Sequence, residues 1–283
     1  MNKLPLEKRV QILSMLCEGS SMRSISRVVG VSINTVTKLL VDAGQFAAEF
    51  HDQNVRGVKS QRIQCDEIWS FSHCKHANLR TATAAPIGSG DVWTWTAIDA
   101  ETKLIVSWLV GDRDTPSACA FIGDLRDRLA NRVQLTTDGH KPYAVAVAEE
   151  NLDADYAMLI KLFGPAPGGV VRYSPPAVIG TKVQNIQGNP DPMHVNTSFA
   201  ERQNLTMRMS MRRFTRLTNA FSKKLDNHYY ALALYFLWYN WIRIHKTTRV
   251  TPAMAAGLTD TLMSWEDMVA LLDARESELK RAA

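Results

Sequence analysis

The sequence predicts an α/β fold that follows a small all-helical segment, and three observations lead to that prediction. The first 45 residues place apolar side chains at helical spacing between suitable capping residues. From residue 62 the pattern changes to short runs rich in β-branched and aromatic residues, which are typical of strands. Further along the chain such runs alternate with helical patterns, as they do where helices cover a sheet.

Composition and charge limit the classes of protein to consider. With 283 residues, 46% hydrophobic and 22% charged, the chain can bury a large core and form two domains. Its net charge of +5 is spread unevenly: residues 1–64 carry +4, 65–200 carry −4, 201–249 carry +8 and 250–283 carry −3. The net charge of +5 favours a polyanionic partner only weakly. The basic segment 201–249, directly after the acidic segment 65–200, needs a functional explanation.

The sequence also argues against secretion and against a membrane. Its four cysteines form no C-x-x-C pair, and a reducing cytosol is the simplest compartment for them. The first ten residues become charged before the apolar core of a signal peptide could form. The most apolar stretch, 229–241, is too short to span a bilayer. We therefore expect a cytoplasmic protein without a membrane partner.

Three helices are expected in residues 1–45. The first covers about 5–17, the second lies between Ser21 and Gly30, and the third begins after Ser32 and is expected to end at Gly44. The short second helix and the glycine at the turn are typical of a helix-turn-helix, whose second helix enters the major groove of DNA.

The polar residues at the start of the third helix are the candidates for contacts with bases and phosphates. They are Ser32, Asn34, Thr35, Thr37 and Lys38. The alternative is a three-helix bundle that serves packing or oligomerisation. Residues 46–61 are expected to form a polar linker to the next unit.

Strands and helices alternate in the centre of the chain. Strands are expected at 62–71, 91–100, 103–112, 133–139 and 155–163, with helices at 115–131, capped by Thr115, and at 140–151. The order of three strands, helix, strand, helix and strand resembles the ribonuclease-H-like fold of polynucleotidyl transferases.

An irregular loop is expected next, because residues 164–192 hold 11 of the 26 Gly and Pro residues. Helix is expected from 196 to about 245, with one break near Thr218.

Three acidic residues are candidates for catalysis. Asp66 lies in the first strand, Asp138 ends the fourth, and Glu201 lies at the start of the long helix. In a ribonuclease-H-like sheet these two strands are neighbours, so the three carboxylates would converge. Carboxylates that meet in this way repel unless a cation offsets them, and all-oxygen ligands suit Mg²⁺ or Mn²⁺. Two such ions would suit phosphodiester chemistry.

Each of these residues also has a structural alternative. Asp66 with Glu67 could be a polar pair at a strand end, and Asp138-Gly139 is an ordinary turn dipeptide. Glu201 follows Ser198 by three and could complete a capping box.

Basic residues near Glu201 favour the catalytic interpretation, because a phosphate backbone beside the carboxylates would need them. Those expected to contact DNA are Arg202, Arg208 and Arg212, the last two on the face of Glu201. Leu205, Met207, Met209 and Met211 are expected to pack the helix.

Around these residues the sequence resembles a known family. CDEIWSF at 65–71, TTDGHKPY at 136–143, the segment 196–228 and YNWIRIHKTTRVTPAMAAG at 239–257 are similar to transposases of the insertion-sequence-one family, over roughly 62–272. The resemblance implies a DDE triad at Asp66, Asp138 and Glu201, with Arg208 as the basic residue seven positions later. It implies metal-dependent strand cleavage and strand transfer at the ends of a mobile element.

The chain departs from many relatives, since no cysteine zinc module precedes the helix-turn-helix. The nearby set Cys65, His73, Cys74 and His76 matches no familiar zinc spacing. His140 could touch substrate or serve only the turn.

The sequence thus predicts a transposase in the prokaryotic nucleoid, acting on DNA with two Mg²⁺ or Mn²⁺ ions and as at least a dimer. Its helix-turn-helix would occupy 1–45, its ribonuclease-H-like DDE domain 62–272, and a tail 273–283. A DNA-binding regulator derived from a transposase is the main alternative, and a nuclease without strand transfer is another.

Overall fold

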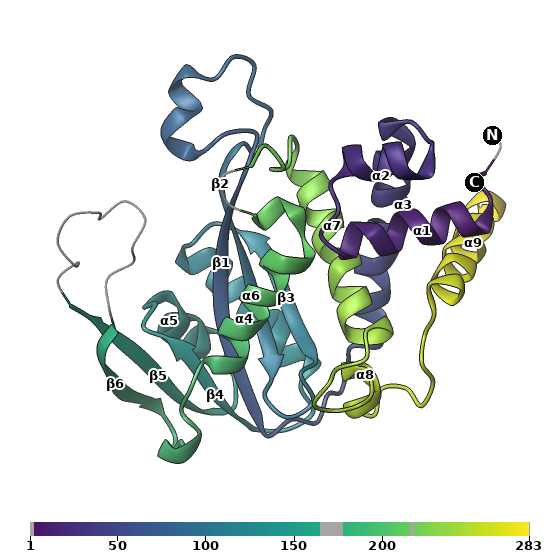
Figure 1. Ribbon diagram of the computed structural model, residues 1–283. Helices are drawn as coiled ribbons and strands as arrows, with labels where there is room; N and C mark the ends of the chain where they lie inside the picture. Colours follow the sequence, from purple (N-terminus) through teal and green to yellow (C-terminus); the bar gives the residue numbers. More distant parts are fainter. Residues whose placement is uncertain (1–2, 165–177, 216–217, 283) are drawn as a thin grey trace.

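One six-stranded sheet organises the chain (Figure 1). The computed structural model describes residues 3–164, 178–215 and 218–282. The strand order is β3-β2-β1-β4-β5-β6, where β4 runs parallel to β1, β5 runs parallel to β4, and the other pairs are antiparallel. The strands are β1 (Arg62–Ser72), β2 (Gly90–Asp99), β3 (Ile105–Gly111), β4 (Val133–Asp138), β5 (Ala154–Phe163) and β6 (Val178–Gln187). All five predicted strands are present, and the first and fourth are neighbours as expected.

The sixth strand corrects the expectation of an irregular loop over 164–192. Residues 178–187 form β6, which pairs with β5 along most of its length at the sheet edge. Backbone hydrogen bonding to an existing strand therefore outweighs the local effect of Gly180. A short 3₁₀ turn (Pro192–His194) follows, and residues 165–177 lie outside the described part of the chain.

Helices cover both faces of the sheet. α4 (Thr115–Arg128) and α5 (Pro142–Glu149) pack together on one face, with α4 against β3. The helix α6 (Ser198–Ser210) crosses β1 on the other face (Figure 1). The cap of α4 is Asp114, whose carboxylate accepts the N–H of Ser117, and not Thr115 as expected.

The N-terminal helices are α1 (Leu6–Cys17), α2 (Met22–Val29) and α3 (Ile33–Asn54). Ser21 and Ser32 cap α2 and α3 as predicted, and Gly30 ends α2 in the left-handed conformation with φ of 67°. A small cluster of buried side chains holds the three helices together: Ile12, Ile25, Val29 and Val36.

The prediction that Gly44 ends the third helix is wrong, because α3 continues to Asn54. Gly44 is instead the point where α3 meets α7 (Leu225–Leu237), since a Cβ there would lie 2.4 Å from the Cβ and the carbonyl oxygen of Tyr230. Beyond it, Phe46 and Ala47 join the main core, and the ring of His51 hydrogen-bonds the carbonyl of Val106 in β3. Residues 46–54 of the expected linker are therefore helix packed on the sheet unit.

The long helix expected from 196 to 245 is also interrupted more widely than predicted. α6 ends at Ser210, a 3₁₀ turn follows (Arg212–Phe214), and α7 begins only at Leu225. Phe214 is buried in the turn, so a tertiary contact replaces helix propagation there. A π turn (Trp238–Ile242) extends α7.

The chain ends in helices as well. They are α8 (Pro252–Ala255) and α9 (Trp265–Ala282), so the expected tail is helical through residue 282. Arg9 pairs with Asp273 and brings the two termini together (Figure 1). None of the helices that the structure describes combines the length and apolarity needed to cross a membrane.

Candidate active site

Parallel pairing of β1 with β4 brings two of the predicted carboxylates together. The pairing ends with Gln64 opposite Thr136, and Asp66 and Asp138 each follow two positions later on their strands. Carboxylate oxygens of Asp66, Asp138 and Glu67 all lie within 4.8 Å of one another. Among the described residues this is the one group of three or more potential ligands of this kind.

Helix α6 places the third carboxylate at the same cavity. The amide oxygen of Gln64 accepts the N–H of Phe199 at 2.8 Å, which fixes the first turn of α6 to β1. Thr197 donates its hydroxyl to Oε1 of Glu201 at 2.6 Å. Because Thr197 is the N-cap, Glu201 occupies the fourth helical position, and the capping-box alternative with Ser198 does not hold. Asp66, Asp138 and Glu201 all line a cavity of about 660 Å³.

The electrostatics of this cavity favour a cation. The pKa of Asp66 is raised to about 7, mainly by burial and in addition by the charges of Glu67, Asp138 and Glu201, while a hydrogen bond from the backbone N–H of Glu67 lowers it. A carboxyl group held in this way takes up a proton near neutral pH unless positive charge arrives. Closely spaced oxygen ligands with a net negative charge fit Mg²⁺ or Mn²⁺.

Asn204 is a residue of the site that the sequence analysis missed. It lies three positions after Glu201 in α6, and its side-chain amide donates to Oδ2 of Asp66 at 2.8 Å. The i, i+3 spacing from Glu201 was visible in the sequence, but a lone asparagine in a helix gives no signal of its own.

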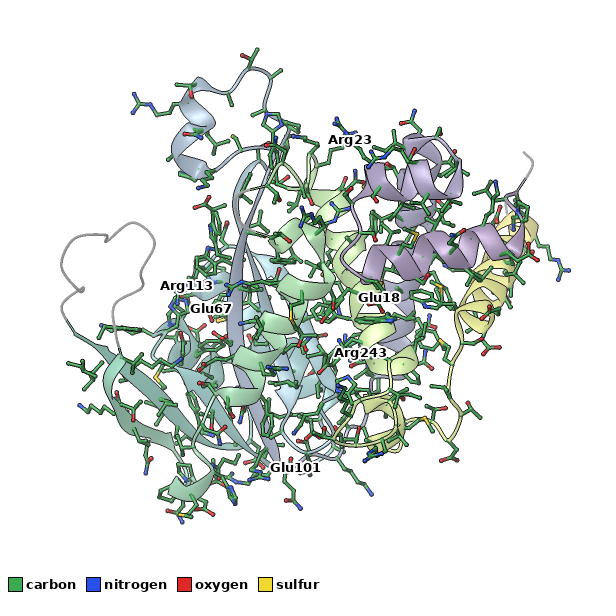
Figure 2. All side chains as sticks on the ribbon, viewed as in Figure 1. Glu18, Arg23, Glu67, Glu101, Arg113 and Arg243 are labelled. Atoms are coloured by element: carbon green, nitrogen blue, oxygen red, sulfur yellow. The ribbon has the colours of Figure 1, made fainter. Side chains whose placement is uncertain are left out.

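Glu67 and Arg113 form a second missed pair, close to Asp66 and Asp138. Figure 2 shows them side by side, and the Arg113 guanidinium donates to Oε1 of Glu67 at 2.6 Å. Tyr143 of α5 donates its hydroxyl to Oε2 at 3.0 Å. Arg113 also lies 3.7 Å from Oδ2 of Asp138. Glu67 therefore holds Arg113 beside the cavity, and it is more than a polar pair at a strand end.

Glu201 is held by a cation of the chain itself. Lys161 of β5 lies 2.6 Å from Oε1 of Glu201. Although burial opposes it, hydrogen bonds from Lys161 and Thr197 lower the pKa of Glu201. The three candidate carboxylates thus share a cavity while meeting different partners.

His140 lies in the cavity wall and keeps both of its expected roles open. Its backbone N–H donates to Oδ1 of Asp138 at 2.9 Å, which fits a role in the turn. Its ring packs on Trp95 and Tyr143, and Nε2 has no hydrogen-bond partner in the described part of the chain.

The predicted basic face holds only in part. Arg202 and Arg208 are exposed on α6 with Glu201, but Arg212 lies beyond the end of the helix and lines a different pocket. The expectation that four apolar residues pack this helix is half right. Met207 and Met211 are buried, while Leu205 and Met209 are 44% and 58% exposed.

The candidate DNA-contact residues of α3 lie at its exposed start, but most have local partners. Ser32 caps the helix and hydrogen-bonds the hydroxyl of Thr35, and Thr37 donates to the carbonyl of Ile33. Lys38 pairs with Asp42 one turn later. Asn34 is exposed.

Comparisons with known proteins leave the family open. No protein-family model matches the chain, and no curated protein matches it. Among solved structures it is similar to that of a piggyBac transposase synaptic complex with hairpin DNA, at 9% identity over 94% of this chain and 69% of that chain. The TM-score of 0.40 is too low to establish a shared fold. Membership of the insertion-sequence-one family stays a prediction.

Proposed function

We propose that the chain is a metal-dependent DNA transposase whose catalytic residues are Asp66, Asp138 and Glu201. One observation carries the proposal: two neighbouring strands and a helix bring these carboxylates to a single cavity. The raised pKa of Asp66 supports it, because charges crowded in this way need a cation. Cation-dependent cleavage of phosphodiesters is the chemistry that such a site serves.

The proposal includes a domain division. The strand order 3-2-1-4-5, with three antiparallel strands followed by two parallel ones, supports a ribonuclease-H-like domain over 62–272. The capped pair α2 and α3 supports a helix-turn-helix over 1–45 that reads the terminal repeats of a mobile element. Residues 46–61 join the two, with 46–54 as the end of α3, and the segment 273–283 begins within α9.

Asp66, Asp138 and Glu201 would hold two Mg²⁺ or Mn²⁺ ions. When bound, such a cation offsets the negative charge that grows on a phosphodiester under attack by water or by a 3′-hydroxyl group. Residues of the chain position the site: Asn204 orients Asp66, and Thr197 orients Glu201. Lys161, in the cavity wall, is placed to contact a strand phosphate there.

DNA contacts outside the cavity are part of the same proposal. Ser32, Asn34, Thr35, Thr37 and Lys38 would meet the element end, and Arg202 and Arg208 would meet the backbone near the catalytic residues. Arg212 would meet the backbone at the separate pocket that it lines. Joining two ends to a target needs two active sites, so we propose at least a dimer on DNA.

A regulator that binds DNA without cutting it is the second candidate. The observation that favours it is the ion pair between Lys161 and Glu201, because a carboxylate neutralised by lysine has less need of a metal. Lys161→Met separates the two candidates. If Glu201 is a metal ligand, removing its competitor increases the affinity for Mg²⁺ several-fold, whereas a regulator gains none. Lys182→Met, an exposed lysine of the adjacent β6, is the control.

The test of the proposed reaction uses linear DNA that carries the sequences flanking the gene, together with a labelled target duplex. A transposase nicks the element end with Mg²⁺ and joins the new 3′-hydroxyl to the target. A nuclease nicks without joining, and a regulator binds without nicking. Asp66→Asn and Asp138→Asn must each abolish nicking while leaving DNA binding intact.

A further inference from the structure

A second pocket lies where the N-terminal helices meet the chain between α6 and α7. We call it the arginine pocket; its volume is about 690 Å³. One wall comes from α2 and α3 and includes Arg23 and Thr37, and the other comes from residues 211–213, residues 218–223 and α7. None of the carboxylates of the proposed catalytic site lines it.

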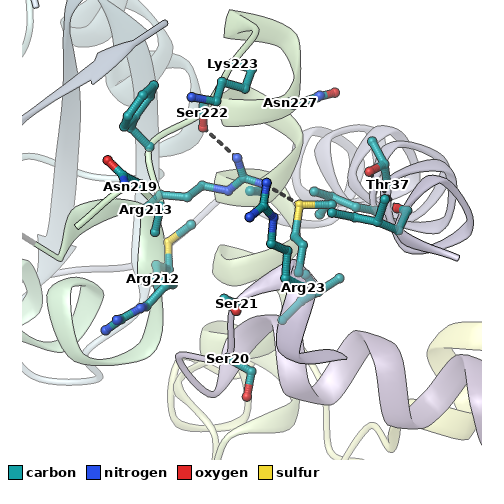
Figure 3. Close-up of a pocket in the computed structure, with 18 of the residues that line it drawn as sticks. Ser20, Ser21, Arg23, Thr37, Arg212, Arg213, Asn219, Ser222, Lys223 and Asn227 are labelled. Carbon is teal, nitrogen blue, oxygen red and sulfur yellow. Dashed lines mark hydrogen bonds between the residues drawn. The ribbon is translucent and has the colours of Figure 1, made fainter. Parts of the chain in front are cut away.

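The charged residues that line the arginine pocket are all cations. They are Arg23, Arg212, Arg213 and Lys223. Throughout residues 3–164, 178–215 and 218–282, no carboxylate forms an ion pair with any of the four. Figure 3 shows the guanidinium groups of Arg23 and Arg213 directed toward one another. Two like charges that face each other across a pocket are stable together when an anion lies between them.

Arg213 is held firmly by neutral groups. It donates to the hydroxyl of Ser222 at 2.6 Å and to the sulfur of Met22 at 3.7 Å (Figure 3). Ser222 in turn lies 3.2 Å from Nδ1 of His228, whose Nε2 lies 3.2 Å from the hydroxyl of Ser70 in β1. Burial lowers the pKa of Arg213 to about 10. The partners are neutral, so this cation is positioned but its charge is not compensated.

The hydrogen bonds that link Arg213, Ser222, His228 and Ser70 all have their donor on the side of the pocket and their acceptor further from it. Ser70 donates to the carbonyl of Val92, so its oxygen accepts from Nε2–H of His228, and Nδ1 accepts from Ser222. Burial and the charge of Arg213 lower the pKa of His228 to about 3, which keeps the ring neutral. Ser222 is left to accept from Arg213, and that guanidinium makes no further hydrogen bond to the residues that the structure describes, apart from the one to the sulfur of Met22.

We propose that the arginine pocket binds a phosphodiester group of a DNA strand between the guanidinium groups of Arg23 and Arg213. Planar guanidinium groups match the geometry of phosphate oxygens, and a cationic pocket without carboxylates selects an anion. The inference rests on the proposed function for the identity of the polyanion. It adds a second DNA-binding site, formed by the N-terminal helices α2 and α3 together with residues that follow α6.

The test compares matched pairs of variants in DNA binding, measured in EDTA so that no cleavage contributes. Arg23→Ala is paired with Arg27→Ala, one turn along the exposed face of α2, and Lys223→Ala with Lys224→Ala. Each pair removes the same charge from nearly the same place, but only the first member lines the pocket. Arg213→Lys keeps the positive charge and fills the space beside Ser222, but it lacks the planar guanidinium group.

The probes are a fluorescein-labelled mixed-sequence oligonucleotide, single-stranded and as a duplex, across a series of KCl concentrations. We expect Arg23→Ala and Lys223→Ala to weaken binding about 10-fold and to reduce the salt slope by about 1, with only small changes in their controls. Arg213→Lys should weaken binding several-fold.

If the two variants of each pair bind DNA with equal affinity and equal salt slope, the proposal for the arginine pocket is wrong, while the proposed catalysis is unaffected. Binding of inorganic phosphate that depends on Arg23, with oligonucleotide binding that does not, would also overturn it and identify a pocket for a free anion. A wild-type protein that binds neither form of the oligonucleotide would overturn both proposals. Loss of nicking in Asp66→Asn with normal binding bears only on the catalytic site.

Discussion

The side-chain amide of Asn204 donates a hydrogen bond of 2.8 Å to Oδ2 of Asp66, so the helix that carries Glu201 also fixes the strand carboxylate. Two contacts at the start of the same helix support this arrangement: Gln64 of β1 accepts the N–H of Phe199, and Thr197 donates to Glu201. Strand β1 and helix α6 therefore position the carboxylates together. A change where they meet should weaken cation binding more than it destabilises the fold.

Asn204→Ala tests this junction. We expect nicking to require several-fold more Mg²⁺, because the freed Asp66 carboxylate loses its fixed orientation. Gln203→Ala is the matched control, since Gln203 is the buried neighbour whose amide donates to Tyr235 away from the cavity. Each variant should lose about 1 kcal/mol of unfolding free energy. Equal Mg²⁺ requirements in the two variants would contradict the role of Asn204.

Asp66→Asn should make the metal-free protein more stable at pH 8. The pKa of Asp66 is about 7 in the folded protein and near 3.8 in the unfolded chain, so its contribution is favourable below 3.8 and is lost as the pH rises through 7. Removing the charge should raise the unfolding free energy by about 2 kcal/mol, a value discounted for partial exposure. Urea unfolding in EDTA measures this.

Mg²⁺ gives the same prediction an independent check. The cation should stabilise wild type at pH 8 and should stabilise Asp66→Asn much less, because the variant lacks one ligand charge. A variant that is less stable than wild type in EDTA, or that responds equally to Mg²⁺, would contradict the crowding of charge at Asp66.

Gly44→Ala should destabilise the fold, although alanine is favoured over glycine inside a helix by about 1 kcal/mol. The new Cβ would lie 2.4 Å from backbone and Cβ atoms of Tyr230, so α3 and α7 must separate. We expect a loss of about 2–3 kcal/mol in thermal or urea unfolding. Gly123→Ala in α4 is the control, since its Cβ meets only the flexible end of Glu150. Equal stability of the two variants would contradict the close packing of α3 on α7.

Gly30 and Gly44 illustrate what local sequence can predict. Both follow an apolar helical pattern, and both predict a helix end. Gly30 does end α2, because the left-handed conformation there is a local preference of glycine. Gly44 serves a contact with Tyr230, 186 positions later, and no local pattern contains that information. The same reason explains the break after Ser210, where the buried Phe214 overrides a sequence that favours helix.

The carboxylates were predictable because their placement follows from strand order. Asp66 and Asp138 come close together once the first and fourth strands are parallel neighbours, and the alternation of strands and helices already favoured that order. Their supporting residues were not predictable. Asn204, Arg113 and Lys161 matter only through distances set by packing, and each is an ordinary polar residue in its own segment.

The measurement that tests the central claim most directly is the rate of Mg²⁺-dependent nicking of DNA carrying the gene's flanking sequences, in Glu201→Gln and in Glu266→Gln. Both variants replace one exposed glutamate near the start of a helix, and only Glu201 lines the cavity. We predict a loss of at least about 100-fold for Glu201→Gln, with unchanged DNA binding, and a rate equal to wild type for Glu266→Gln. Nicking by Glu201→Gln at the wild-type rate would contradict the assignment of the three carboxylates as a catalytic site.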